Sequence, residues 1–161
     1  LVKMYRVAVL TINDRSSCGQ KEDKSGKIVQ DIIKALPGEV VKYEIIPDEA
    51  KIIKEKLTFY ADTLKVDLVL TNGGTGWTSR DFTPEATKEV IQREIPGIPE
   101  AMRTECLKFT KKAMLSRGIA GIRGKTLIIN LPGSLSGAQE SLEAILGGLA
   151  HGLDMIAERQ H

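Results

Sequence analysis

The sequence predicts a single α/β domain with a mostly parallel β-sheet; the alternation of its segments predicts the fold class, and its length and composition predict a single domain. Short β-branched runs alternate along the chain with segments whose apolar residues recur at helical spacing, which is typical of parallel sheets. The chain has 161 residues, a length that suits one domain. Hydrophobic residues make up 42% of the chain, which is enough to form one buried core, and charged residues make up an ordinary 27%. We therefore expect residues 1–161 to form a single domain.

Three strands and two helices are expected in the first half of the chain. The runs that predict strands are Tyr5–Ile12, Val40–Ile46 and Asp67–Thr71. Asp23 or Ser25 caps the first helix and Pro37-Gly38 ends it. Its apolar face consists of Ile28, Val29, Ile32, Ile33 and Leu36. Asp48 and Glu49 begin the second helix, at the positive end of its dipole, and this helix carries Ile52, Ile53, Lys56, Leu57 and Tyr60.

A glycine-rich loop from Asn72 to Asp81 opens the second half. We expect Thr83 to cap the next helix, with Pro84 in its first turn and Pro96 at its end. A further helix is expected over residues 99–112, a short strand or a turn over 117–123, and a strand over 126–131. The final helix contains Gly147 and Gly148. Because glycine weakens a helix, these two predict close backbone packing or a break there.

Composition argues against several classes of partner. Lys and Arg number 23 and Asp and Glu 21, and aromatic residues are 4%, so the sequence shows neither a basic footprint nor a stacking platform for nucleic acid. The longest stretch without charged side chains, residues 126–139, contains a proline and is too short to span a membrane. Two cysteines and two histidines without CxxC or HExxH spacing make a zinc site improbable. We expect a cytoplasmic protein whose cysteines are reduced.

The turns that follow the strands are where chemistry is expected, because ligands of open α/β sheets bind at the carboxyl ends of the strands. The glycine loop Thr71 to Gly76 leaves a strand and approaches a helix N-terminus, so its N–H groups could bind an anion. A plain flexible turn is an equally good interpretation of so short a motif. The loop is neither a GxxxxGK[ST] phosphate loop nor a GxGxxG dinucleotide motif.

Several charged side chains near these turns have two interpretations each. Asp81 could face a divalent cation beside a phosphate, or bond to its own loop backbone. From the residues alone, a helix-dipole role is favoured for Asp48 and a capping role for Asp14. Arg80 and Arg117 could hold phosphate or be solvated. His151 lies among leucines and is expected to be a partly buried packing residue.

The string TNGGTGWTSRDFTPEAT, residues 71–87, resembles the GGTGxxxRDxTPEAT signature of the Mog/MoaB family of molybdenum-cofactor biosynthesis proteins. Four further segments resemble the family's motifs in the same order. They are Asn13-Asp14-Arg15 with Asp23-Lys24-Ser25-Gly26, Pro47-Asp48-Glu49, Leu115 to Ser134, and His151 to Ile156. The resemblance therefore covers nearly the whole chain. The chain departs from the family's pattern at Asn13, Trp77 and Leu135-Ser136.

The resemblance implies a three-layer α/β/α, MogA-like domain that is usually a homotrimer. It implies transfer of AMP from ATP to the terminal phosphate of molybdopterin, with Mg²⁺ needed, pyrophosphate released and hand-over to other molybdenum-cofactor biosynthesis proteins. Asp48 and Asp81 match the family's catalytic aspartates, which overturns the dipole interpretation of Asp48 and makes it the expected metal ligand. The expected substrate-binding residues are Asp14, Ser25, Gly26, Gly73, Gly74, Thr75, Gly76, Asn130, Pro132, Gly133 and Ser134. Two alternatives remain open, a noncatalytic molybdopterin-binding or carrier protein and an oligomeric scaffold.

Overall fold

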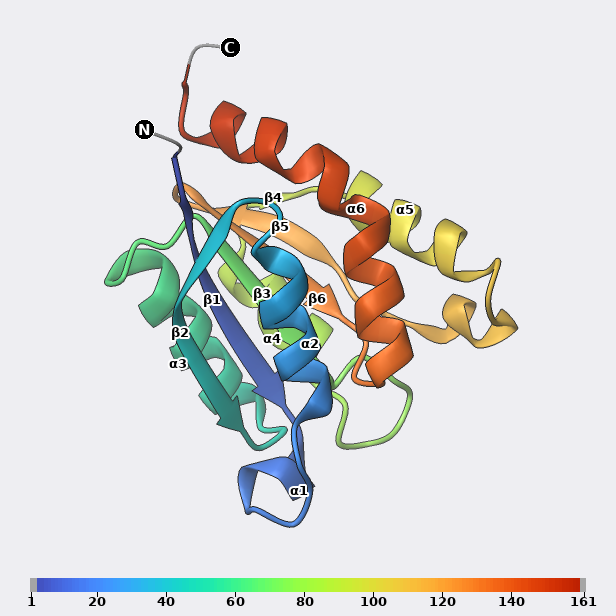
Figure 1. Cartoon of the computed structure of the whole chain (residues 1–161). Coiled ribbons are helices and arrows are strands. Elements are labelled where there is room, and N and C mark those ends of the chain that lie inside the picture. Colours follow the sequence, from blue (N-terminus) through green and yellow to red (C-terminus); the bar gives the residue numbers. More distant parts are fainter. Residues whose placement is uncertain (1–2, 160–161) are drawn as a thin grey trace.

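The computed structural model describes residues 3–159, and in this part of the chain one six-stranded sheet forms the centre of the molecule (Figure 1). The strands are β1 (Tyr5–Ile12), β2 (Gly38–Ile46), β3 (Leu68–Asn72), β4 (Arg93–Glu94), β5 (Ala120–Arg123) and β6 (Thr126–Leu131). The helices are α1 (Asp14–Ser17), α2 (Lys24–Ile33), α3 (Ala50–Asp62), α4 (Thr83–Val90), α5 (Gly97–Cys106), η1 (Lys111–Leu115, a 3₁₀ helix) and α6 (Leu135–Ile156).

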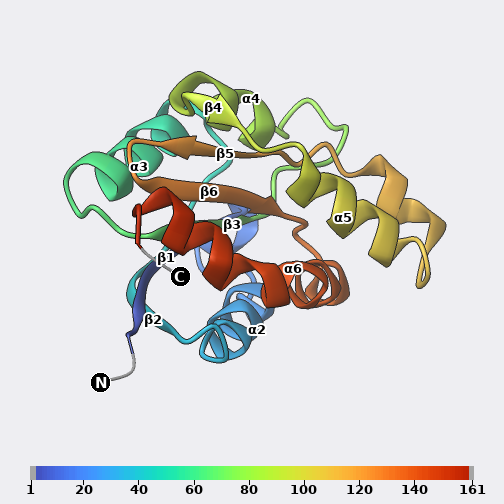
Figure 2. The ribbon, with the colours of Figure 1, turned by 90° about the horizontal axis from the view of Figure 1, so that it is seen from above.

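Helices cover both faces of this sheet, and the predicted three-layer α/β/α fold is confirmed. Helices α2, α5 and α6 lie on one face and α3 and α4 on the other (Figure 2). Strands β3 and β6 are buried throughout, and β1 is buried except at Arg6, because successive side chains point to opposite faces and helices cover both. Val7 and Val9 of β1 pack into the core under α2 and α6, whereas Ala8 and Leu10 pack into the core under α3.

The order of the strands is β2-β1-β3-β6-β5-β4, and the first four of these run parallel. The chain passes from β1 to β2 on one side and then returns to place β3 on the other side of β1. The connections that leave the carboxyl ends of β1 and β3 therefore diverge, and this kind of switch point leaves a crevice for ligands. The expected mostly parallel sheet is confirmed, with β4 and β5 as its antiparallel edge.

The element predictions for the first half of the chain are confirmed within a few residues. Asp23, and not Ser25, is the residue that caps α2, since its carboxylate accepts the Gly26 N–H at 2.9 Å. The polar stretch between β1 and α2 is not irregular throughout. It contains the four-residue helix α1, whose N-cap Asn13 accepts the Ser16 N–H.

The elements between β3 and β5 differ from the prediction. Helix α4 begins at Thr83, so Phe82 is the N-cap and the Thr83 side chain does not cap it. The helix ends at Val90 rather than near Pro96, because the chain becomes extended at Ile91 and residues 93–94 pair with β5. Helix α5 ends at Cys106, and a separate 3₁₀ helix follows.

Helix α6 is continuous, and its two neighbouring glycines neither break it nor pack closely. A β-carbon at Gly147 or Gly148 would meet no atom within 4 Å, so the prediction of close packing within this chain was wrong. His151 is exposed rather than partly buried. Cys18 is exposed, Cys106 is buried, and both are free thiols.

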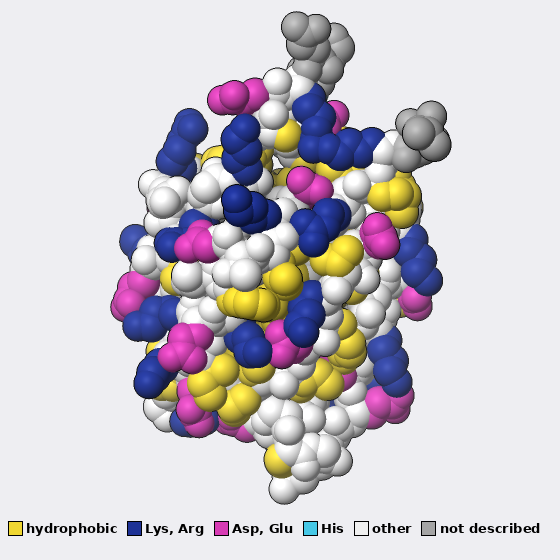
Figure 3. All heavy atoms as spheres, turned by 90° about the vertical axis from the view of Figure 1, so that its left-hand side faces the viewer, with side chains coloured by type: hydrophobic (Ala, Val, Ile, Leu, Met, Phe, Trp, Pro, Cys, Tyr) yellow, Lys and Arg dark blue, Asp and Glu magenta, His cyan; other side chains and the backbone are white. Residues whose placement is uncertain are grey.

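Charges of both signs are mixed on the face that α3 presents to solvent (Figure 3). Two ion pairs of this helix, Lys54 with Glu89 and Lys56 with Glu44, have N–O distances of 2.8 and 2.7 Å. Within residues 3–159, no helix combines the length and the apolar character that crossing a membrane requires.

Candidate functional site

The glycine loop after β3 is held in place by backbone contacts on both sides. Gly73 and Gly74 have φ angles of +103° and +70°, a region that favours glycine. The Gly73 N–H donates to Leu131 O at the end of β6, and the Thr83 N–H donates to Gly74 O. Arg117 donates its backbone N–H to Thr75 O at 3.0 Å and its Nε to Gly76 O at 2.8 Å. The loop is therefore fixed rather than a flexible turn.

This fixed loop presents unused hydrogen-bond donors. Among residues 3–159, the backbone N–H groups of Gly74, Thr75 and Gly76 have no hydrogen-bond acceptor. Consecutive N–H groups in a tight turn form a concave anion-binding surface. Helix α4 begins nine residues beyond Gly74 and adds the positive end of its dipole to the same region. The geometry favours anion binding over the plain-turn interpretation.

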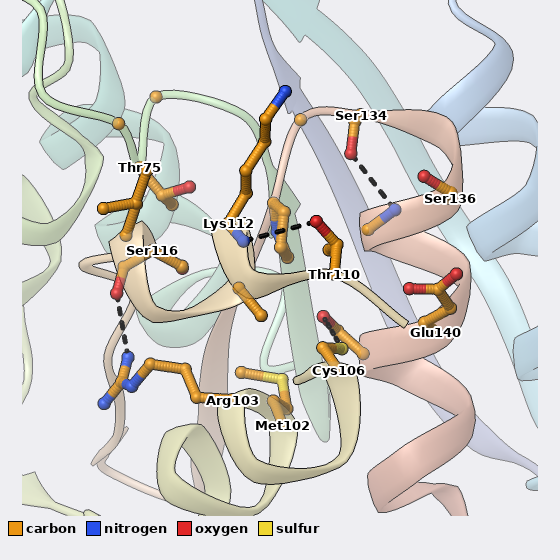
Figure 4. A pocket seen from close by; sticks show the side chains of 18 of the residues that line it. Thr75, Met102, Arg103, Cys106, Thr110, Lys112, Ser116, Ser134, Ser136 and Glu140 are labelled. Carbon is orange, nitrogen blue, oxygen red and sulfur yellow. Dashed lines mark hydrogen bonds between the residues drawn. The ribbon is translucent and has the colours of Figure 1, made fainter. Parts of the chain in front are cut away.

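A cavity of about 350 Å³ lies beside the loop and extends to α5, η1 and α6 (Figure 4). Seven residues that were predicted for the site line it: Gly74, Thr75, Gly76, Asp81, Pro132, Gly133 and Ser134. Sequence reasoning missed the opposite wall, which includes Met102, Arg103, Cys106, Lys112, Leu115 and Glu140. These come from elements that only tertiary packing brings to the loop, and no local motif marks them.

Asp48 is the most deeply buried carboxylate near the loop, with 6% of the residue exposed. It follows β2, and its Oδ1 accepts the Phe82 N–H at 3.2 Å. Burial raises the pKa of Asp48 to about 6; the Phe82 N–H opposes the rise, and the negative charges of Asp81 and Asp14 add to it. A cation bound nearby would stabilise the ionised form of this buried carboxylate, and such a carboxylate is a candidate functional residue.

Asp14 and Arg80 form the exposed side of this group. Asp14 accepts the Asp48 N–H at 2.9 Å, and Arg80 binds both Asp14 carboxylate oxygens at 3.1 and 3.2 Å. The Arg80 hydrogen bonds hold the pKa of Asp14 below its usual value, and the Asp48 N–H acts in the same direction. The ends of β1 and β2 are thus joined to the glycine loop through charged contacts.

Asp81 shows both features that the sequence left open. Its Oδ2 accepts the Thr78 N–H at 2.8 Å and the Thr78 hydroxyl at 2.9 Å, as a loop-capping carboxylate does. The same residue lines the cavity, and a β-carbon at Gly76 would lie 2.9 Å from that oxygen. Arg117 Nη2 donates to Asp81 O, so the same arginine contacts both the middle and the end of the loop. Arg117 consequently holds the loop through its carbonyl groups and is not a free phosphate ligand.

The Thr83 hydroxyl is the one buried side-chain polar atom without a hydrogen-bond partner in the described residues. It lies against Gly74, as Asp48 Oδ2 does: a β-carbon at Gly74 would be 2.1 Å from Thr83 Oγ1 and 2.9 Å from Asp48 Oδ2. An unpaired buried hydroxyl beside a buried carboxylate is an oxygen-rich donor set of the kind that suits Mg²⁺. Across residues 3–159, no cluster of three or more His, Cys, Asp or Glu is arranged to hold a metal ion.

Ser25, Gly26 and Asn130 do not line this cavity, but Ser25 lines a separate small cleft together with Gly73 and Gly133. Ser25 donates its hydroxyl to Gly133 O at 2.8 Å, which links the start of α2 to the turn after β6. Gly26 lies under Asp23, where a β-carbon would collide with the carboxylate. Asn130 is fully buried; its amide donates to the Thr71 and Thr87 hydroxyls, and its oxygen accepts the Ile119 N–H. Through these contacts Ser25 and Asn130 connect neighbouring elements of the site, and the substrate-binding role of Ser25, Gly26 and Asn130 stays a prediction.

Comparison with known proteins agrees with this geometry. The family model described as "Probable molybdopterin binding domain" matches residues 8–151. A molybdopterin adenylyltransferase of Helicobacter pylori strain J99 is 45% identical over 157 residues, which cover 96% of this chain and 89% of that protein. Gephyrin of Dictyostelium discoideum is 42% identical over 160 residues, but these cover only 22% of gephyrin.

A solved structure gives the same result for the fold. The molybdopterin biosynthesis enzyme MoaB of Thermus thermophilus superposes with a TM-score of 0.92 at 48% identity, over 97% of this chain and 98% of that protein. The structural similarity covers nearly the whole chain, and the family match runs from β1 into α6.

Proposed function

The chain belongs to the molybdopterin-binding family of molybdenum-cofactor biosynthesis proteins, and from this premise we propose that it transfers AMP from ATP to the terminal phosphate of molybdopterin. It is a molybdopterin adenylyltransferase, as its relatives of similar length are named. One observation carries the proposal: three unused N–H groups of a fixed loop lie next to the buried Asp48 and the half-buried Asp81.

The reaction needs little from a general base. The attacking group is already an anionic phosphate, since the second pKa of a phosphomonoester is about 6. One of its oxygens forms a bond to the α-phosphorus of ATP, the bond from that phosphorus to the bridging oxygen breaks, and pyrophosphate leaves with the electron pair. The protein has to align two polyanions and stabilise charge. The N–H groups of Gly74, Thr75 and Gly76 are suited to hold a phosphate in that alignment.

Magnesium is proposed as the partner of ATP, and the donor set beside Gly74 fits it. Asp48 would hold the ion, with the Thr83 hydroxyl as a further oxygen in reach of the same region. The ion would neutralise phosphate charge. Asp48 supplies the negative charge that retains the ion, and Asp14 and Arg80 fix the backbone on which Asp48 is carried.

We further propose that the protein is a cytoplasmic homotrimer that passes its product to other proteins of molybdenum-cofactor biosynthesis. The family resemblance supports the trimer, and the use of ATP supports the location. Light scattering should give a mass near three chains, and a monomer at micromolar concentration would contradict the trimer.

The proposed activity has a direct test. Purified protein, molybdopterin, ATP and Mg²⁺ should yield adenylylated molybdopterin together with pyrophosphate. Pterin binding without any pyrophosphate release, under conditions in which a relative with this activity turns over, would instead identify a noncatalytic carrier.

A further inference from the structure

The cavity has four charged side chains in its lining, and their contacts differ. The Arg103 guanidinium has a structural role, since its Nη1 donates to Ser116 O at 3.2 Å and to Gly118 O at 3.0 Å. The Asp81 carboxylate accepts hydrogen bonds from the Thr78 N–H and hydroxyl. Glu140 and Lys112 stand on different walls and, within residues 3–159, form no ion pair with each other. Lys112 is therefore the cation of this cavity whose charge no described residue neutralises.

The geometry of η1 explains why Lys112 faces the cavity and its neighbour does not. A 3₁₀ helix has three residues per turn, so residues three apart share a face. Lys112 and Leu115 both line the cavity, whereas Lys111 and Met114, one step earlier on each turn, do not. The Thr110 hydroxyl accepts the Lys112 N–H at 3.2 Å and so fixes the start of η1.

The exposed Lys112 side chain lies near the glycine loop and the start of α6. Figure 4 shows the side chain extended between the glycine loop with Thr75 and the turn with Ser134. The unused N–H groups of the loop lie on one side of it, and the start of the 22-residue helix α6, with the Ser134 and Ser136 hydroxyls, lies on the other. A cation between two sets of N–H donors neutralises an anion that both sets bind.

We propose that Lys112 is a substrate-binding residue that holds a phosphate group of one of the two substrates in this cavity. This proposal rests on the proposed adenylyl transfer for its role in turnover, but the binding itself does not depend on turnover. The phosphate belongs either to the polyphosphate of ATP or to molybdopterin, and measurements on each substrate distinguish the two.

The test compares Lys112→Gln with Lys111→Gln, which removes the same charge from an adjacent residue that is also exposed but does not line the cavity. Lys112→Arg keeps the charge. Binding of ATP, pyrophosphate and molybdopterin is measured separately by calorimetry and by the fluorescence of Trp77, the single tryptophan. Its indole N–H donates to Leu115 O at the cavity rim. Thermal unfolding of each variant checks that the fold is intact.

We expect Lys112→Gln to weaken binding of one of these substrates about tenfold at low salt. Lys111→Gln should change it less than about twofold and Lys112→Arg less than about threefold. In turnover, KM for the same substrate should rise while kcat changes little. Weakened ATP and pyrophosphate binding assigns the ATP polyphosphate, and weakened molybdopterin binding alone assigns the pterin phosphate.

Equal affinities of Lys112→Gln and Lys111→Gln for all three ligands would overturn the proposal. A different result would overturn the proposed adenylyl transfer itself: the wild-type protein would then release no pyrophosphate at all. The binding comparison would still decide the role of Lys112 in that case.

Discussion

Asp14 and Asp48 lie 34 positions apart, yet the Asp14 carboxylate accepts the Asp48 backbone N–H at 2.9 Å. This bond ties the turn after β2 to the turn after β1, and the salt bridge of Asp14 with Arg80 extends the tie to the glycine loop. The ion pair of Asp14 and Arg80 consequently holds the backbone that carries the buried Asp48 side chain. Its environment leads to two predictions about pH.

The first prediction concerns stability. The pKa of Asp48 is raised from 3.8 to about 6 in the folded protein, mainly by burial. The native state then binds more protons than the unfolded state between these values, so the free energy of unfolding falls as the pH rises through this window. Asp48→Asn removes this cost and keeps the acceptor for the Phe82 N–H.

We expect Asp48→Asn to be more stable than wild type by about 2 kcal/mol above pH ~7 and equally stable near pH ~4. Denaturant unfolding at several pH values measures this difference. Glu49→Gln, a change at the adjacent exposed carboxylate, is the control. A difference that is independent of pH would mean that Asp48 is not costly to ionise.

The second prediction concerns activity. If the ionised form of Asp48 is needed to retain Mg²⁺, kcat/KM should fall as the pH drops below about 6. More Mg²⁺ should move this acid limb to lower pH, because a bound cation favours the charged carboxylate. A pH–rate profile at two Mg²⁺ concentrations tests both statements, and an acid limb that ignores Mg²⁺ would separate Asp48 from the metal.

The glycine loop gives the third prediction, since its glycines have different tasks. A β-carbon at Gly73 would lie 2.1 Å from Ile12 O, on a backbone with φ of +103°. One at Gly76 would meet only the end of the Asp81 side chain, at 2.9 Å. Gly73→Ala should therefore destabilise the fold, whereas Gly76→Val should keep its circular dichroism and melting temperature and lose binding of pterin or nucleotide. Unchanged ligand binding by folded Gly76→Val would assign the loop a purely structural role.

The sheet and the glycine loop were predictable because their signals are local. The β-branched, apolar run Tyr5–Ile12 identifies β1 directly, and the glycines after β3 identify a tight turn. The cavity's far wall was not predictable, since Met102, Arg103 and Lys112 reach the loop only through the packing of α5 and η1. No periodicity in those segments points toward residues 74–76.

The predicted N-cap role of Thr83 was wrong for a different reason. A threonine before a proline at a helix start is typical of an N-cap, and the sequence pattern predicts that role for it. The helix starts one residue earlier than this pattern indicates, with Phe82 as its N-cap and no side-chain cap. The Phe82 N–H donates to Asp48, in the turn after another strand, and the Thr83 hydroxyl is left without a partner beside Gly74.

The last prediction separates the two aspartates. In Asp81→Asn the new amide oxygen would still accept the Thr78 N–H, so this change should preserve the loop while removing a charge that faces the cavity. We expect this variant to bind molybdopterin and to lose adenylyl transfer by about 10²–10³-fold, the cost of losing an electrostatic contact in a transition state. Asp48→Asn should instead weaken Mg²⁺-dependent use of ATP, with partial rescue at high Mg²⁺, because its carboxylate lies with the Thr83 hydroxyl beside Gly74. Initial rates across Mg²⁺ concentrations, together with a molybdopterin binding isotherm, distinguish the two effects. Turnover within a few-fold of wild type in both variants would return Asp81 to loop capping and Asp48 to its helix-dipole role.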